Sequence, residues 1–217
     1  LGVIDDKGRA ISGDKLLLLL AKEMLKSTKC KVIADVKCSQ VLFDEVERLG
    51  GEIFMCKTGH SHVKNNLKKL NADLAGEMSG HIFYAKDYYG FDDAFFAAVK
   101  VLEIVNNNDK KLSDLVDEIP RVFNTPEIRI DCDDNKKFDI IRKITERQKR
   151  SKKKITDIDG VRVSEKDGWW LLRASNTQPA IVLRCESLTQ NGLDFQKQSV
   201  KDELSEFDID IDEKIIS

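Results

Sequence analysis

Two short segments of this 217-residue chain carry most of the side chains that could do chemistry. Residues 76–81 read Gly-Glu-Met-Ser-Gly-His, which places a carboxylate, a hydroxyl and an imidazole in one glycine-framed segment. Residues 173–179 read Arg-Ala-Ser-Asn-Thr-Gln-Pro, which places a guanidinium beside neutral hydrogen-bond donors. The first set suits the vicinal hydroxyls of a sugar ring, and the second suits a phosphate group.

The hydroxyl-binding candidates in the first segment are Glu77, Ser79 and His81. Their flanking glycines permit backbone turns that other residues resist and allow a ligand to approach closely. The segment follows a predicted strand, at the edge where parallel sheets bind ligands. The alternative is a structural loop, in which Glu77 caps local backbone and His81 packs under Tyr84.

In the second segment, Arg173 ends a predicted strand and residues 174–178 form a tight loop before the next one. Backbone amides of such a loop can converge on an anion. The guanidinium can grip two phosphate oxygens, while Ser175, Asn176 and Thr177 add neutral donors. The alternative is an ordinary polar hairpin with its arginine in a surface ion pair.

Two further strand ends bring polar side chains to the same edge of the predicted sheet. Lys37 could neutralise a phosphate or assist proton transfer, and His60 could transfer a proton near neutral pH. A metal site is disfavoured, because His60 and His62 lie two apart in an expected loop and zinc needs further ligands and a second shell.

Strands and helices must position these loops, and the first half of the chain alternates between them. This alternation predicts a three-layer α/β fold with a parallel-type mixed sheet covered on both faces. Asp14 is expected to be the N-cap of one helix, and Gly50-Gly51 to end another. The expected strands cover residues 32–36, 53–56 and 73–75, and the expected helices cover residues 15–25, 40–49, 61–70, 92–105 and 112–119.

The pattern changes after a linker framed by Pro120 and Pro126. Strands now follow one another, and Lys166-Asp167-Gly168 reads as a hairpin turn. The order predicts a smaller α+β domain with an antiparallel sheet. The expected strands cover residues 128–132, 160–163, 169–173 and 181–186, and the expected helices cover residues 135–148 and 195–206.

These patterns divide the chain into three expected parts. Residues 1–28 read as the tail of a truncated preceding α/β domain, because the apolar run Leu1 to Asp5 enters without a turn or cap. Residues 29–122 are expected to form an α/β sugar-binding domain. Residues 123–217 are expected to form an α+β phosphate-binding domain.

Charge and composition disfavour nucleic-acid and membrane partners. The net charge is only -2, and the basic run at 147–154 lacks the aromatic platforms of a nucleic-acid site, so it reads as a solvated helix end. The longest apolar run, Leu16 to Ala21, is too short to span a bilayer, and we expect a cytoplasmic protein. The five cysteines contain no C-x-x-C pair and are expected to be reduced thiols, most of them buried.

Four motifs in order resemble the α-D-phosphohexomutase superfamily, most closely its bacterial phosphomannomutase/phosphoglucomutase branch. They are D-V-K-C at 35–38, T-G-H-S at 58–61, G-E-M-S-G-H at 76–81 and R-A-S-N-T-Q-P at 173–179. The resemblance spans nearly the whole chain and corresponds to the third and fourth domains of those enzymes. It implies interconversion of hexose 6-phosphate and hexose 1-phosphate, with mannose or glucose as the sugar, through hexose 1,6-bisphosphate.

The same resemblance implies roles for the candidate residues. Glu77 and Ser79 would hold the 3- and 4-hydroxyls of the sugar, with His81 beside them. Lys37 and His60 would lie near the reacting end, in orientation and proton transfer. The phosphate that is not transferred would be held by Arg173, Ser175, Asn176 and Thr177.

The family's phosphoserine and Mg²⁺-binding loop belong to its first two domains. The resemblance therefore implies that Mg²⁺ is bound upstream of Leu1, that this chain holds no metal ligand, and that it is inactive without the missing N-terminal domains. Two alternatives stay open. One is a phosphoglucosamine mutase fragment, although Met78 differs from the residue usual in that branch, and the other is a non-catalytic sugar-phosphate-binding module.

Overall fold

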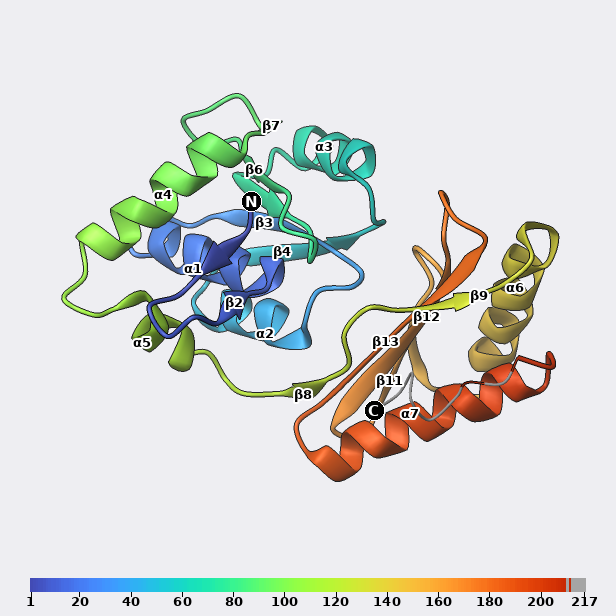
Figure 1. The fold of residues 1–217 in the computed structure, drawn as a ribbon. Helices are drawn as coiled ribbons and strands as arrows, with labels where there is room; N and C mark the ends of the chain where they lie inside the picture. The colour runs from blue at the N-terminus through green and yellow to red at the C-terminus, as the bar shows by residue number, and fades with distance from the viewer. Residues whose placement is uncertain (210, 212–217) are drawn as a thin grey trace. The chain divides into compact units, whose positions relative to one another are not determined.

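The computed structural model describes residues 1–209 and 211, and the chain forms two compact units, Leu1–Pro120 and Arg121–Ser217 (Figure 1). Residues 1–28 lie within the first unit, which differs from their expected place in a separate preceding domain. The reason is the helix α1 (Gly13–Leu25), whose residues Leu16 to Leu20 are buried within this unit. The second division falls after Pro120, close to the expected one.

A mixed five-stranded sheet forms the centre of the first unit, in the order β4-β3-β5-β6-β7. The strands β4, β3 and β5 are parallel, whereas β6 and β7 join antiparallel at one side. The parallel-type mixed sheet is therefore confirmed, although β6 and β7 were not expected. Their bounds are β3 (Lys31–Asp35), β4 (Glu52–Cys56), β5 (Leu74–Gly76), β6 (Ile82–Tyr84) and β7 (Phe91–Asp92).

Helices cover both faces of this sheet, so the three-layer prediction is confirmed. On one face α1 packs against β5 and against the helices α2 and α4. On the other face α3 packs on β3, β4 and β5, and Val63 of α3 shares a buried cluster with Ile33 and Phe83. The remaining helices of the unit are α2 (Gln40–Arg48), α3 (His60–Lys69), α4 (Ala94–Asn106) and α5 (Leu112–Asp117).

The start of α1 differs from the prediction that made Asp14 its N-cap. Ser12 occupies the N-cap position, and Asp14 lies in the first helical turn. The buried Asp14 carboxylate accepts hydrogen bonds from Lys15 N and, across the fold, from Ser39 N, both at 2.9 Å. Asp14 therefore connects α1 to the segment after β3, a contact that a local capping pattern does not reveal.

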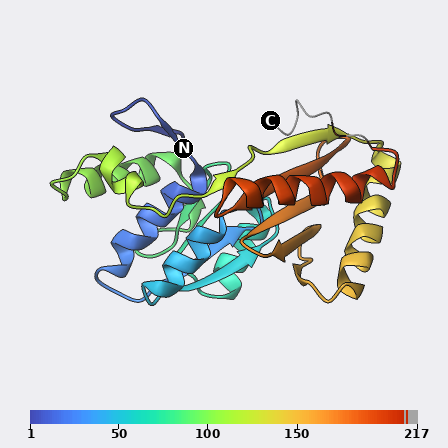
Figure 2. The same cartoon turned by 90° about the horizontal axis from the view of Figure 1, so that it is seen from below.

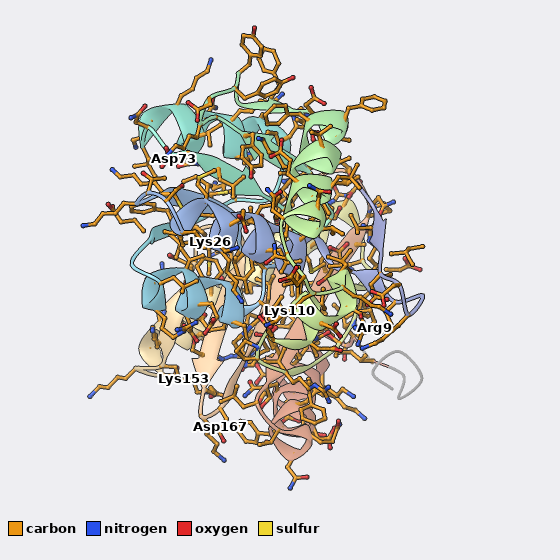
Figure 3. The ribbon with its side chains drawn as sticks, turned by 90° about the vertical axis from the view of Figure 1, so that its left-hand side faces the viewer. Arg9, Lys26, Asp73, Lys110, Lys153 and Asp167 are labelled. Atoms are coloured by element: carbon orange, nitrogen blue, oxygen red, sulfur yellow. The ribbon has the colours of Figure 1, made fainter. Side chains whose placement is uncertain are left out.

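A short hairpin precedes α1 and is fixed to α5 by charged side chains. The hairpin pairs β1 (Val3–Ile4) with β2 (Ala10–Ile11). Arg9 Nη1 and Lys7 Nζ donate to the Asp117 carboxylate at 2.7 and 3.0 Å (Arg9 is labelled in Figure 3). These hydrogen bonds, that from Arg9 first, lower the pKa of Asp117 to about 2.

The second unit is a smaller α+β domain with an antiparallel sheet, as predicted, and both of its helices pack on one face of that sheet. The sheet order is β10-β11-β12-β13-β8, and β9 pairs with the other half of β13. The helices α6 and α7 share one core with the sheet, which includes Ile144, Trp170 and Val200 (Figure 2). Its elements are β8 (Phe123–Asn124), β9 (Ile128–Asp131), α6 (Asp134–Arg150), β10 (Lys154–Thr156), β11 (Val161–Glu165), β12 (Gly168–Ala174), β13 (Ala180–Ser187) and α7 (Gln190–Ser205).

The cysteines and the basic run at 147–154 also have the surroundings that the sequence predicts. All five cysteines are free thiols, and four of them are buried, with Cys132 half-buried. Cations of the basic run pair with carboxylates of the same unit, as Arg147 does with Glu203 and Lys149 with Asp157. Within residues 1–209 and 211, none of the helices has the length and apolar character needed to cross a membrane.

Candidate functional site

The three parallel strands of the first unit end side by side. Asp35 at the end of β3 is paired with Cys56 of β4, and Ala34 is paired with Gly76 of β5. The polar segments that follow these strands, residues 36–39, 57–60 and 77–81, therefore leave the sheet at one edge. This edge is where open α/β sheets bind ligands.

The carboxylate of Asp35 links these three segments. Its Oδ1 accepts hydrogen bonds from Met78 N at 3.2 Å and from the Cys38 thiol at 3.0 Å, and its Oδ2 accepts one from Thr58 Oγ1 at 3.2 Å. Lys37 Nζ lies 3.8 Å from the same Oδ2. Because Asp35 is fully buried, these contacts also satisfy a charge that would be costly to bury alone.

Glu77 joins the second and third segments more directly. Its buried carboxylate accepts a hydrogen bond at 2.6 Å through Oε1 from Gly59 N, at the N-terminus of α3. Gly59 adopts φ +117, a conformation that suits glycine. Within the part of the chain that the structure describes, Oε2 makes no hydrogen bond, so it remains an acceptor for a ligand hydroxyl.

The first turn of α1 packs closely against the 76–81 loop. Gly13 N donates to Met78 O at 3.2 Å. A Cβ at position 13 would lie 2.4 Å from Glu77 O and 2.5 Å from Gly80 N, so only glycine fits this close approach. The shape of the loop therefore depends on a helix that begins more than sixty residues earlier in the chain.

The other candidates of this unit differ in their surroundings. Lys37 is buried beside Asp35, whereas His60, Ser79 and His81 are exposed. His60 is the first residue of α3 and also lines a surface pocket of ≈ 500 Å³ between α3 and residues 85–91. His81 Nδ1 lies 2.7 Å from Asp92 Oδ2, so β7 holds its ring. The structure thus places Lys37 beside Asp35 and Glu77 against Gly59, and it leaves the other three exposed to solvent.

In the second unit, Arg173 is buried near the end of β12 and Nε donates to Asp159 Oδ2 at 3.0 Å. Ser175 Oγ accepts from Gln178 N at 3.2 Å and from Thr177 N at 3.4 Å. These two loop amides are therefore engaged inside the loop, instead of converging on an anion as expected. Asn176 and Thr177 have exposed side chains at its tip.

Sequence reasoning missed the charged residues that position these loops: Asp35 and Asp14 in the first unit, and Asp159 in the second. Each contacts a residue distant in the chain, so its positioning role was not predicted, even though Asp35 opens the D-V-K-C motif and Asp14 was expected to be an N-cap. Among the described residues, no group of three or more His, Cys, Asp or Glu side chains could hold a metal ion. The residues present therefore do not form a Mg²⁺ site.

Comparison with known proteins identifies both units. The family model described as phosphoglucomutase/phosphomannomutase, alpha/beta/alpha domain III, matches residues 12–123, and the one described as phosphoglucomutase/phosphomannomutase, C-terminal domain, matches residues 127–202. The chain belongs to the phosphoglucomutase/phosphomannomutase family. The 76–81 loop lies in domain III of this family and the 173–179 loop in its C-terminal domain. The first match begins at residue 12 and so includes α1.

Individual relatives agree with this assignment. The chain is 43% identical to a phosphomannomutase/phosphoglucomutase of Pseudomonas syringae pv. tomato, over 89% of this chain and 42% of the relative. It is 39% identical to a phosphoglucomutase of Neisseria gonorrhoeae, over 89% of this chain and 43% of the relative. A crystal structure of a phosphoglucomutase/phosphomannomutase family protein from Burkholderia thailandensis superposes with a TM-score of 0.84 and 35% identity, covering 94% of this chain and 44% of that one. The chain thus spans less than half the length of these relatives.

Proposed function

We propose that this chain is the C-terminal, substrate-recognition half of a phosphohexomutase that interconverts hexose 6-phosphate and hexose 1-phosphate, of mannose or glucose, through hexose 1,6-bisphosphate. The observation that carries the proposal is the grouping of three strand-end segments around Asp35 at the ligand-binding edge of a family domain. The names of the relatives favour this enzyme over a phosphoglucosamine mutase.

The first unit supplies the groups that would recognise the sugar. Glu77 Oε2 would accept from a ring hydroxyl, while Gly59 N holds Oε1 and thereby fixes the carboxylate plane. Ser79 can donate or accept, and the His81 ring is held by Asp92 for the same purpose. Lys37 and His60 would orient the reacting end of the substrate and move protons there.

The second unit supplies the groups that would hold the phosphate that is not transferred. Arg173 offers Nη1 and Nη2, which make no other hydrogen bond or ion pair within the described residues. Asn176 and Thr177 add exposed neutral donors, and the Ser175 hydroxyl proton is available because its oxygen acts as the acceptor inside the loop. A charge-assisted fork with neutral donors around it suits a phosphate monoester.

Phosphoryl transfer needs a donor group and a cation that neutralises charge, and we place both outside this chain. The described residues form no metal site, so Mg²⁺ would be held by the domains that the relatives have in addition. The chain by itself is then inactive. We also propose a cytoplasmic location, which the five free cysteines support.

The test is a mutase assay on the complete gene product with glucose 1-phosphate and mannose 1-phosphate. We expect the complete protein to convert at least one of the two sugar 1-phosphates to its 6-phosphate, and we expect this chain alone to convert neither. Arg173→Ala should lower kcat/KM by about a hundredfold, because it removes a charge-assisted phosphate contact. A complete protein that binds hexose phosphates without converting them would contradict the mutase and leave a binding module.

A further inference from the structure

Two charged residues outside the 173–179 segment contact its two ends, the buried Lys137 and the half-buried Asp159. Lys137 lies on α6, and its side chain is 4% exposed. Asp159 lies in the turn before β11, and its side chain is 14% exposed. Removing a charge from water is costly unless it is paired, and among their contacts both groups bind the 173–179 segment.

The first arm of the loop is its end at Arg173, and Asp159 contacts this arm. Its Oδ2 accepts the Nε hydrogen of Arg173 at 3.0 Å. The next residue, Gly160, has φ +82, and a Cβ there would lie 2.2 Å from Leu172 O and 2.7 Å from the Arg173 Cα. The backbone of the Asp159-Gly160 turn therefore packs directly against the backbone of β12. With Nε held, the guanidinium fork has one orientation, in which Nη1 and Nη2 remain for a ligand.

The second arm of the loop is its end at Gln178 and Pro179, and Lys137 contacts this arm. Its Nζ donates to the Asp134 carboxylate on the same helix and, across 41 residues of sequence, to Gln178 O at 2.7 Å. Arg129 Nη1 donates to Gln178 Oε1 at 2.5 Å, and Cys132 N donates to Pro179 O at 2.9 Å. The carboxyl end of the loop is thus tied to β9 and α6, whereas its tip at Asn176 and Thr177 stays exposed.

We propose that Asp159 and Lys137 are positioning residues of the phosphate-binding loop: Asp159 orients the Arg173 guanidinium, and Lys137 fixes the Gln178 arm. The inference rests on the proposed function of this loop. Its physical basis is preorganisation, because an arginine that is already oriented loses less rotamer freedom when the phosphate binds. Neither residue touches the phosphate in this account.

Asp159 gives the sharper test, because a positioning role and a simple charge effect predict opposite changes in phosphate affinity when its carboxylate is removed. Removal of a carboxylate beside the site would strengthen anion binding if charge alone mattered. If Asp159 positions Arg173, its removal weakens binding instead. We expect Asp159→Ala to weaken binding about tenfold, equivalent to one lost charge-assisted hydrogen bond. Asp159→Asn keeps an acceptor for Nε and should recover part of the affinity.

The affinity is measured on the nitrogen-15-labelled chain, from the amide shifts of Asn176 and Thr177 during titration with inorganic phosphate and with glucose 6-phosphate. Asp157→Ala is the matched control, because it removes an exposed carboxylate two residues earlier that pairs with Lys149. Thermal unfolding of each variant shows whether it is folded. Tighter binding by Asp159→Ala, or a loss equal to that of Asp157→Ala, would overturn the proposal.

A double variant tests whether Asp159 affects phosphate binding through Arg173 or independently of it. In an Arg173→Ala background, Asp159→Ala should have no further effect on phosphate affinity, because its target is absent. Additive losses would contradict the proposed route through Arg173. For the second arm, Lys137→Met should broaden or shift the Asn176 and Thr177 amides and weaken binding, whereas Lys136→Met, an exposed neighbour of equal charge, should not.

Failure of the proposed function looks different from failure of this inference. If the wild-type chain shows no phosphate-dependent shifts and Arg173→Ala changes nothing, the loop is not a phosphate site. If the wild-type chain binds and Arg173→Ala weakens binding, but Asp159 and Lys137 variants match their controls, the phosphate site stands and the positioning roles are wrong.

Discussion

The two oxygens of Glu77 have different surroundings, and this difference defines what the residue can do. Oε1 is held by Gly59 N at 2.6 Å, whereas Oε2 has no hydrogen-bond partner within residues 1–209 and 211. A glutamine keeps an oxygen for Gly59 N but loses the charge and one acceptor. Glutamine therefore separates the structural contact of Glu77 from its contact with a ligand.

We predict that Glu77→Gln weakens binding of glucose 6-phosphate about tenfold or more, because a hydrogen bond to a charged group is lost. Inorganic phosphate should bind as before, since it has no hydroxyls of a sugar ring to recognise. Calorimetric titration of both ligands measures this, with Glu47→Gln, an exposed residue of α2, as the control. Parallel loss of both affinities would mean that the loop is only structural.

At this scale the sequence reveals some residues and not others, for a physical reason. Glu77 and Arg173 were predicted because their neighbours in sequence are also their neighbours in the loop. The positioning roles of Asp35 and Lys137 were missed because their contacts with Met78 and Gln178 span 43 and 41 residues. The side chains that we propose to bind a ligand form local motifs, whereas the side chains that contact those motifs from elsewhere in the chain are recognised only in the fold.

Among the elements, α1 has a second role besides filling the core of the first unit. Its first turn lies against the 76–81 loop without room for a side chain at position 13. A methyl group there must move either the helix or the loop, and insertion of a methyl group into a packed region typically costs about 1–3 kcal/mol. The loop is the more movable partner because its tip is exposed.

Gly13→Ala should therefore lower stability by about 1–3 kcal/mol and weaken glucose 6-phosphate binding more than inorganic phosphate binding. Gly2→Ala is the control, because nothing lies within 4 Å of a Cβ at that position. Denaturant unfolding and ligand titration of the two variants give both quantities. Wild-type behaviour of Gly13→Ala would contradict the support role of α1.

The hairpin before α1 depends on charge, through Asp117 of α5. Its pKa lies at about 2, below the ordinary value of 3.8, because Arg9 and then Lys7 donate to it. A lowered carboxyl pKa stabilises the folded state above the unfolded pKa, and this contribution is lost as the pH falls through the folded value.

We predict that the thermal midpoint of the wild-type chain falls faster than that of Asp117→Asn as the pH is lowered from about 5 to about 2. Asp109→Asn removes an equal charge from the exposed segment before α5 and should follow the wild type. Equal slopes for the wild type and Asp117→Asn would show that these ion pairs do not hold the hairpin.

Element prediction succeeded where a pattern was long enough to have a period. The strands around Val32, Ile53 and Leu171 and the longer helices lie where apolar periodicity placed them. The strands β2, β6, β7, β8 and β10 were missed; each has only two or three residues, too few for alternation to mark it, although the equally short β5 was predicted. Tertiary pairing forms these strands, and β6 and β7 supply the antiparallel side of the expected mixed sheet.

In the whole molecule, our proposal gives the two family domains two different binding roles. Hydroxyl recognition is assigned to the first unit and phosphate recognition to the second, and each unit has its own sheet and core. The relatives are more than twice as long as the matched region, so the transfer step belongs to the remaining domains in our proposal. The central claim is thus that this chain recognises both parts of a hexose phosphate.

That claim is tested most directly by amide shift mapping of the labelled chain with two ligands. Glucose 6-phosphate should shift amides of both loops, residues 76–81 and 174–178, whereas inorganic phosphate should shift only those of residues 174–178. Glucose 6-phosphate shifts confined to one loop, or spread over surfaces outside both, would contradict the account.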